Sequence, residues 1–231
     1  LPFHTWHSLL FNTRYYWYNL VTVLLVFDVL TGRVSGFRPA HGGVMHNILA
    51  ADIGGTNSRF AHFTENGDGS LRLVDTLWLD TTRVRSFPEL LEKLWDSEFP
   101  LKPGETDAAA FAIAGPVERG GVYSNPPLIS WDVDVSEPEK LGLSHAVLVN
   151  DFVAQAYACR TEPGENAVEI LPGRVDPDGS LAAMGAGTGL GKAILSPDGK
   201  GSFLAVPSEG GHAAFPFLSG PEYEYQSFLQ K

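Results

Sequence analysis

The sequence predicts a mixed α/β fold, and two features support this prediction. From residue 47 onward, short apolar runs typical of strands alternate with stretches whose apolar residues recur at helical spacing. One order of elements also occurs twice, beginning near residues 47 and 181: a strand, a glycine–threonine turn, a strand, a second turn and a third strand. Two such units facing each other would frame a cleft with a glycine-rich turn on each wall.

The first unit opens with strands predicted at 47–53, 58–64 and 71–79. The turn between the second and third contains Asn-Gly and Asp-Gly, which favour tight hairpins. A helix is predicted next, because Ser86 and Glu89 have the spacing of a capping box. The remaining predictions for this unit are a buried strand at 108–114, a short strand at 117–123, a helix capped by Ser136 with Glu139 and stopped at Gly142, a strand at 145–149 and a helix at 151–159.

The second unit follows a stretch rich in proline and glycine at 163–180. It consists of strands predicted at 181–184, 190–196 and 203–206, joined by a glycine turn and a hairpin turn. The predicted division of the chain is an extension over 1–44, a first, small α/β domain over 45–160, a connecting segment over 161–180 and the beginning of a second, larger domain over 181–231.

The composition narrows the function classes. The chain has 231 residues, 44% of them hydrophobic and 19% charged, which is an ordinary globular composition. Its net charge of −11 argues against nucleic acid or an anionic membrane as the main partner, although a small nucleotide responds to its local cleft. Cys159 is the single cysteine, so no internal disulfide or multi-cysteine zinc site can form. This cysteine usage suits a reducing cytoplasm.

Residues 1–44 differ from the rest of the chain. They are rich in aromatic residues, and the apolar run at 20–30 is shorter than the roughly 20 residues that a spanning helix needs. The first methionine is Met45, and a strand pattern starts directly after it. We therefore expect the natural start at Met45 and an upstream extension that does not belong to the core fold. An interfacial or partner-binding segment stays open as the alternative.

The first candidate site motif is the turn at 52–57. Glycine lets backbone N–H groups approach phosphate oxygens closely, and the Thr56 hydroxyl adds a donor. Asp52, at the end of a predicted strand, could hold Mg²⁺ directly or through water. The candidate nucleotide-binding residues here are Asp52, Gly54, Gly55, Thr56 and Asn57. The alternative is a tight hairpin with a purely structural role.

The second motif is the glycine-rich turn at 185–191. It is not a Walker A loop, because Ala193 stands where Ser or Thr would bind Mg²⁺, and Ala186 replaces a glycine. It is not a dinucleotide fingerprint, because Leu190 takes the place of the third glycine. The motif fits a turn between two strands whose amides can grip a phosphate, and a plain loop is the alternative. The candidate residues are Gly187, Thr188 and Gly189.

Two further motifs carry side chains suited to catalysis or sugar binding. Asn150 and Asp151 lie where a strand meets a helix, so Asp151 is either a proton acceptor for an attacking hydroxyl or an ordinary helix N-cap. Glu209 and His212 flank two glycines and could reach adjacent sugar hydroxyls, or they could form a polar turn. Zinc is disfavoured there, because no second His or Cys lies at ligand spacing.

These motifs occur in an order that resembles the bacterial glucokinase family. The matching segments are LAADIGGTNSRFA, FAIAGPV, SNPPLISWDV, LVNDFVAQAYA, MGAGTGLGKA and PSEGGHAAF, which together span about residues 47–217. The resemblance implies an actin-like or ribonuclease H-like ATPase fold of two domains with a cleft between them. It implies a cytoplasmic glycolytic kinase that uses ATP and Mg²⁺ to phosphorylate glucose, or a closely related hexose, at the 6-hydroxyl. A homodimer is compatible with it.

The resemblance also assigns roles to residues. The turns at 52–57 and 185–191 look like the two phosphate loops, and Asp151 is similar in position to the family's general base. The matching sugar-contacting residues are Asn125, Asn150, Glu209 and His212. Family chains run on for roughly another hundred residues with further sugar- and adenosine-binding motifs. On that basis we expect an incomplete chain, and whether it is active without the missing part stays open.

Three alternatives stay open. The ROK (repressor, open reading frame, kinase) family shares the Asp-x-Gly-Gly-Thr loop, but typically carries a cysteine-rich zinc motif after the sugar-binding histidine, and no cysteine follows Cys159 here. A non-catalytic sugar-binding or regulatory protein derived from a kinase is the second. A chaperone- or actin-type ATPase is the third, and it would need no Glu-x-x-His loop.

Overall fold

A computed structural model describes the fold of most of the chain. The described residues are 8–10, 46–65, 71–160, 168–174, 176, 178–186, 190–201, 203–213 and 216–230. Within these ranges, no helix is both long enough and apolar enough to cross a membrane. The expectations for residues 11–44 and for the turn at 187–189 lie outside the described residues.

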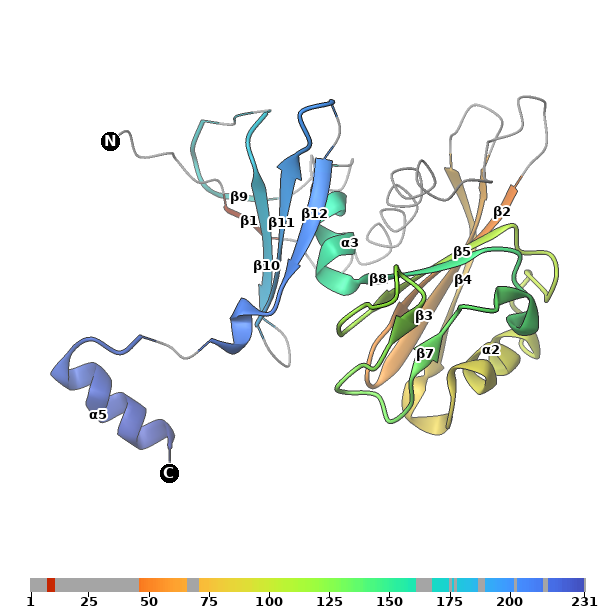
Figure 1. Ribbon diagram of the computed structural model, residues 1–231, viewed down its shortest axis with the longest axis horizontal. Helices are drawn as coiled ribbons and strands as arrows, with labels where there is room; N and C mark the ends of the chain where they lie inside the picture. The colour runs from red at the N-terminus through yellow and green to blue at the C-terminus, as the bar shows by residue number, and fades with distance from the viewer. Residues whose placement is uncertain are drawn as a thin grey trace.

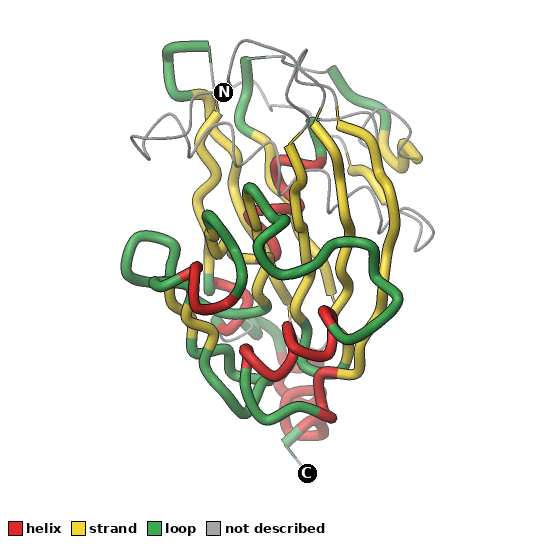
Figure 2. Tube along the Cα trace, turned by 90° about the vertical axis from the view of Figure 1, so that its right-hand side faces the viewer, coloured by secondary structure: helices red, strands yellow, loops and turns green. Residues whose placement is uncertain are grey.

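A five-stranded mixed sheet organises the first unit (Figures 1 and 2). Its strand order is β4-β3-β2-β5-β8; the first three strands are antiparallel neighbours, and β2, β5 and β8 run parallel. The parallel strands therefore end at the same edge of the sheet, which is where ligands bind in open α/β sheets. The bounds are β2 His46–Ile53, β3 Asn57–Glu65, β4 Leu71–Asp80, β5 Ala108–Ile113 and β8 Ala146–Asn150.

Helix α2 (Phe87–Trp95) covers one face of this sheet and forms the main core with it. Phe87, Leu90, Leu91 and Leu94 are buried at helical spacing, and Phe87 meets Phe111 of β5 edge to face at 5.1 Å between ring centroids. Such pairs combine a large buried apolar area with favourable ring geometry. The predicted helix and its apolar face are confirmed.

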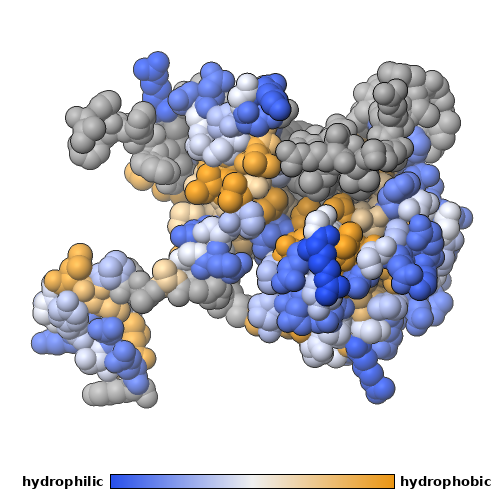
Figure 3. All heavy atoms as spheres, in the orientation of Figure 1, coloured by the Kyte–Doolittle hydropathy of each residue, from blue (hydrophilic) through white to orange (hydrophobic). Residues whose placement is uncertain are grey.

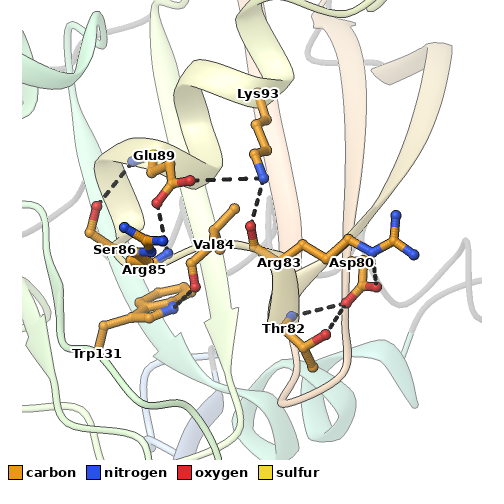
Figure 4. Close-up of polar contacts among 9 residues, drawn as sticks. All are labelled: Asp80, Thr82, Arg83, Val84, Arg85, Ser86, Glu89, Lys93 and Trp131. Atoms are coloured by element: carbon orange, nitrogen blue, oxygen red, sulfur yellow. Dashed lines mark hydrogen bonds and ion pairs between the residues drawn. The ribbon is translucent and has the colours of Figure 1, made fainter.

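The N-terminus of α2 confirms half of the predicted capping box (Figure 4). Ser86 Oγ accepts a hydrogen bond from Glu89 N at 3.2 Å, as an N-cap does. The Glu89 carboxylate, however, accepts from Arg85 N at 2.8 Å rather than from Ser86 N. Nearby, Trp131 Nε1 donates to Val84 O at 3.2 Å and connects the loop at 125–132 to the start of the helix.

Helix α3 (Asp151–Ala158) lies between the two sheets and contacts both (Figure 1). Small residues allow this close packing, since Ala110 and Ala112 of β5 are buried against Ala154 of the helix. On its other side, α3 packs against an antiparallel sheet of order β10-β11-β12, where Ala156 meets Ala183, Ala193 and Leu195. The bounds are β10 Leu181–Ala186, β11 Leu190–Pro197 and β12 Phe203–Ser208.

The predicted repetition of three strands is confirmed. Both β2-β3-β4 and β10-β11-β12 are antiparallel meanders, each with a glycine-rich connection between its first two strands. In the second meander, Gly199 and Gly201 adopt positive φ angles of 74° and 89° in the predicted hairpin turn, which glycine does without steric cost.

Two local predictions in the first unit are wrong. The strand expected at 117–123 reduces to the two-residue β6 (Tyr123–Ser124), which pairs with β7 (Val133–Asp134), and an isolated bridge between Glu118 and Tyr123. Ser136 caps no helix, because its backbone N–H and its hydroxyl both donate to Asp134 Oδ1. A short 3₁₀ helix, η3 (Pro138–Leu141), forms instead, and it ends at Gly142 as predicted.

Two further elements lie outside the main sheets. Strand β1 (Ser8–Leu10) pairs antiparallel with β9 (Val168–Leu171), and neither strand was predicted from the sequence.

Helix α5 (Gly220–Leu229) starts in a complete capping box formed by Ser219 and Glu222, and none of its residues is buried. Figure 3 shows apolar residues on its surface. Phe228 and Leu229 are among the exposed apolar side chains of this helix. The proposed domain division remains a prediction.

Candidate functional site

Asp52 and Asp151 lie at the edge where the parallel strands end. In the strand register, Asp52 of β2 pairs with Ala112 of β5, which pairs with Val149 of β8, two residues before Asp151. In this row across the sheet, the small side chain of Ala112 alone separates Asp52 of β2 from β8. The topology brings together two acidic groups that are 99 positions apart in the sequence.

Asp52 also belongs to a cross-strand row with Arg59 of β3 and Trp78 of β4. Arg59 Nη1 lies 3.2 Å from Asp52 Oδ2, and the guanidinium carbon lies 4.3 Å from the centre of the Trp78 ring. Burial raises the pKa of Asp52, and Arg59 opposes this by its charge and its hydrogen bond. Neither Arg59 nor Trp78 is among the residues that the sequence predicts for the site. The available signal for them in the sequence is the alternation of side chains along β3 and β4.

The donor chemistry of Asp52 fits a magnesium ion bound together with a nucleotide. Mg²⁺ usually takes one or two carboxylates, with phosphate and water completing its shell. Within the described part of the chain, no group of three or more His, Cys, Asp or Glu side chains is placed to hold a metal. Asp52 would therefore serve as a single protein anchor rather than as part of a closed metal cage.

The turn at 52–57 is held tightly from both sides. Gly54 N donates to Asn57 O at 3.1 Å, so this amide closes the turn, as the hairpin interpretation expects. A Cβ at Gly55 would lie 2.9 Å from Leu128 O, and Thr56 O accepts from Thr81 N at 2.9 Å. The glycine at 55 is thus required by the close approach of the loop that contains Asn125, which brings this loop against the turn.

Asn125 is itself tied down within that loop. Its side-chain amide donates to Asp132 Oδ1, and Tyr123 Oη donates to Asp132 Oδ2 at 2.7 Å. The same loop packs against the end of β5, since a Cβ at Gly115 would lie 3.0 Å from Pro126 Cα. The loop therefore approaches the ends of both β2 and β5.

The helix start at 150–151 separates the two roles considered for Asp151. Asn150 is the N-cap: its Oδ1 accepts from Phe152 N at 3.0 Å and from Val153 N at 3.2 Å. Its Nδ2 donates to Gly115 O at 3.1 Å, which leaves one amide hydrogen for a ligand. Asp151 is the first residue of the helix, and its Oδ1 accepts from Phe152 N at 2.9 Å. The N-cap interpretation of Asp151 is therefore wrong.

The carboxyl group of Asp151 is electrostatically unusual. The pKa of Asp151 is raised from its ordinary value to about 6, chiefly by burial. The charges of Asp52 and Glu209 act in the same direction as burial, and the hydrogen bond from Phe152 N opposes them. A carboxylate whose pKa lies near neutral pH is suited to accept a proton and to release it again. Carboxyl groups whose pKa is shifted by burial and by specific neighbouring charges cluster at functional sites.

The loop at 209–212 follows β12 of the second sheet and contributes a charge to the site. Glu209 precedes the short helix η4 (Gly210–His212), and its charge acts on Asp151. Gly211 sits directly on β11, since a Cβ there would lie 1.7 Å from Leu190 O. The His212 side chain and the candidate residues Gly187, Thr188 and Gly189 lie outside the described residues, so their roles stay predictions.

If the 209–212 loop contacts a hexose, as the family resemblance implies, Gly211→Ala is expected to displace this loop and to weaken hexose binding by about tenfold or more, which corresponds to about 1.4 kcal/mol. The added methyl group would collide with the rigid backbone carbonyl of Leu190. Gly210→Ala is the matched control, because its methyl group would meet side-chain atoms alone, the movable end of Lys192 and the Ser208 hydroxyl. Calorimetric titration with glucose measures both; equal affinities for the two variants would contradict the assigned contact.

Comparison with known proteins gives a consistent result. The sequence model of the family described as Glucokinase matches residues 49–231. The chain is 34% identical over 200 residues to a glucokinase of Synechocystis sp., covering 82% of this chain and 55% of that protein. It is 35% identical over 169 residues to a glucokinase of Saccharophagus degradans, covering 73% and 51%. The chain spans about half the length of the curated relatives it matches.

Solved structures agree with this. The crystal structure of glucokinase from an Antarctic psychrotroph superimposes with a TM-score of 0.61 at 28% identity, covering 80% of this chain and 56% of that one. Glucokinase from Balamuthia mandrillaris, solved in complex with glucose, superimposes with a TM-score of 0.55 at 20% identity, covering 89% and 58%. The second likeness concerns the fold alone. The predicted actin-like sugar kinase fold is confirmed by these neighbours.

Proposed function

The chain belongs to the glucokinase family, and we propose that it carries the sugar-binding and proton-accepting part of a site that transfers the γ-phosphoryl group of ATP to the 6-hydroxyl of glucose. The observation that supports this most is the placement of Asp151. Its carboxyl group lies in the first turn of α3, beside the sheet edge that carries Asp52, and its pKa is about 6. A simple helix cap explains neither feature, because Asn150 is the cap.

Asp151 would hold the 6-hydroxyl and accept its proton as the oxygen attacks phosphorus. Phosphoryl transfer needs mainly alignment and charge stabilisation, because its transition state is loose. Asp52 would hold Mg²⁺, which when bound neutralises charge on the transferred phosphoryl group. The amide of Gly54 closes its own turn, so the other amides of the turn at 52–57 and those of the turn at 185–191 would hold phosphate oxygens from the two sheets. Closure of the site would exclude water as a competing nucleophile.

The remaining hydroxyls of the sugar are assigned to polar side chains around Asp151. Asn150 keeps one amide hydrogen for a ligand, and Glu209 lies close enough for its charge to act on Asp151. Asn125 contributes from the loop that packs on Gly55. His212 completes the set by its place in the 209–212 loop. A closely related hexose in place of glucose, a cytoplasmic location, a homodimer and the absence of a nucleic-acid partner stay predictions.

The test uses a hybrid, because the chain spans about half the length of its curated relatives. In the hybrid, the chain is followed by the part of the Synechocystis glucokinase that lies beyond the match. Glucose, ATP and Mg²⁺ are expected to give glucose 6-phosphate and ADP in equal amounts, detected by ³¹P NMR. 6-Deoxyglucose should bind and remain unphosphorylated. Binding of glucose without any product would instead support the non-catalytic sugar-binding alternative.

A further inference from the structure

The ring of Phe152 is seated on a pair of glycines in the second sheet. Gly185 of β10 and Gly191 of β11 face each other directly across the strand pair. A Cβ at Gly191 would lie 1.8 Å from Phe152 Cε2, and a Cβ at Gly185 would lie 2.9 Å from Phe152 Cζ. No side chain larger than hydrogen fits beneath the ring at Gly191, so this contact requires glycine there.

The backbone of the same residue holds the candidate base. Phe152 N lies 2.9 Å from Asp151 Oδ1 and 3.0 Å from Asn150 Oδ1, so one N–H serves both the base and the helix cap. This hydrogen bond favours the ionised form of Asp151 and opposes the effects of burial and of the neighbouring charges. Any shift of the Phe152 backbone would therefore change both the orientation and the electrostatics of Asp151.

From this geometry we infer that Phe152 is a positioning residue, which fixes Asp151 to the β10–β11 hairpin through its ring and its backbone N–H. The inference rests on the proposed function only in naming Asp151 as the base. It also gives Gly185 and Gly191 a packing role in the glycine-rich motif that is separate from phosphate binding. Displacement of the β10–β11 hairpin would therefore displace the Phe152 ring, and with it the Phe152 N–H that donates to Asp151.

The test observes the amide and the carboxyl group directly in the full chain. Hydrogen exchange at the residue 152 amide reports local opening, and the ¹³C resonance of the Asp151 carboxyl group reports its titration. The groups whose charges act on this carboxyl group are Asp52 of β2 and Glu209 before η4. Both residues stay unchanged in every variant, so a shift in the titration midpoint reports the 152 contact rather than a lost charge.

Phe152→Leu keeps an apolar side chain but removes the flat ring. Gly191→Ala adds a methyl group that displaces the Phe152 ring from its contact with the glycine pair. Each is expected to speed exchange of the 152 amide by about tenfold or more and to move the Asp151 midpoint by about half a pH unit or more. The matched control is Tyr157→Leu in the same helix. Tyr157 Oη donates a hydrogen bond to Phe203 O at 3.1 Å and accepts one from Ala205 N at 3.2 Å, so this variant loosens contacts to the same sheet away from the glycine pair.

Two results would overturn the inference. In the first, Phe152→Leu and Tyr157→Leu lower the free energy of unfolding alike, and the exchange rate of the 152 amide and the titration midpoint of Asp151 are also the same in both variants. Phe152 would then be a core residue only. The second concerns the contact itself. Removing the ring makes room for the methyl group, so Phe152→Ala/Gly191→Ala should be more stable than Gly191→Ala alone. A double variant that is no more stable would contradict the seating of the ring, even if Gly191→Ala fails to fold.

Discussion

Asp151→Asn is expected to lower turnover of glucose in the hybrid by about 10²- to 10⁴-fold, which is the usual value of general-base assistance. Asparagine has the same shape and can still hold the 6-hydroxyl, but it cannot accept the proton. The affinity for glucose should therefore change much less than the turnover. Steady-state kinetics together with calorimetric titration separate the two quantities.

The structure makes this comparison sharper than the sequence alone allowed. Asn150 caps α3, so loss of activity in Asp151→Asn cannot be attributed to a lost cap. Asp178→Asn, at an exposed position outside the site, serves as the control for removing a negative charge. A turnover within about threefold of the parent would remove Asp151 from the mechanism. A collapse of glucose affinity with unchanged turnover would reassign it to binding.

The same substitution is expected to stabilise the fold at neutral pH. The pKa of Asp151 is raised to about 6 in the folded chain, so the folded state holds this proton more tightly than the unfolded state does. Stability should therefore fall as pH rises from about 4 to about 6, by up to about 3 kcal/mol for a shift of about two pKa units. Asp151→Asn removes this loss, since its amide does not ionise.

Denaturant unfolding of the chain at pH 4 and at pH 7 measures the effect. The variant should match the parent near pH 4 and exceed it by about 1–3 kcal/mol near pH 7. Asp178→Asn should show no such difference. A variant that is less stable than the parent at pH 7 would contradict the electrostatic description of the site, because the carboxylate would then contribute favourably to folding. A gain in stability with a loss of activity is typical of a strained functional group.

Local patterns were enough to predict most of the first meander and the helices that follow it. Alternation, turn residues and the Ser86 cap act over a few residues, and β2, β3, β4 and α2 follow them. The cap predicted at Ser136 failed because Asp134, two residues earlier, takes both of its hydrogen-bond donors. Strand β1 was missed because its three residues are paired only with β9, about 160 positions later.

The candidate site was predictable as a set of motifs but not as a set of contacts. Asp52 was identified at the end of a strand and Asp151 directly after one, and the parallel sheet brings these positions to one edge. The row from Asp52 to Trp78 depends on strand register, which local patterns do not give. The seat of Phe152 on Gly191 depends on how α3 packs against the second sheet, and only tertiary structure shows it.

Titrating the full chain with glucose while observing the Asp151 carboxyl resonance tests the central claim most directly. If Asp151 holds the 6-hydroxyl, D-glucose should shift this resonance saturably and change its titration midpoint, and L-glucose should do neither. The Asp178 resonance should stay constant in both titrations. The assignment of the site would be contradicted if calorimetry shows D-glucose bound to the chain while the Asp151 resonance does not change. The sugar would then bind elsewhere.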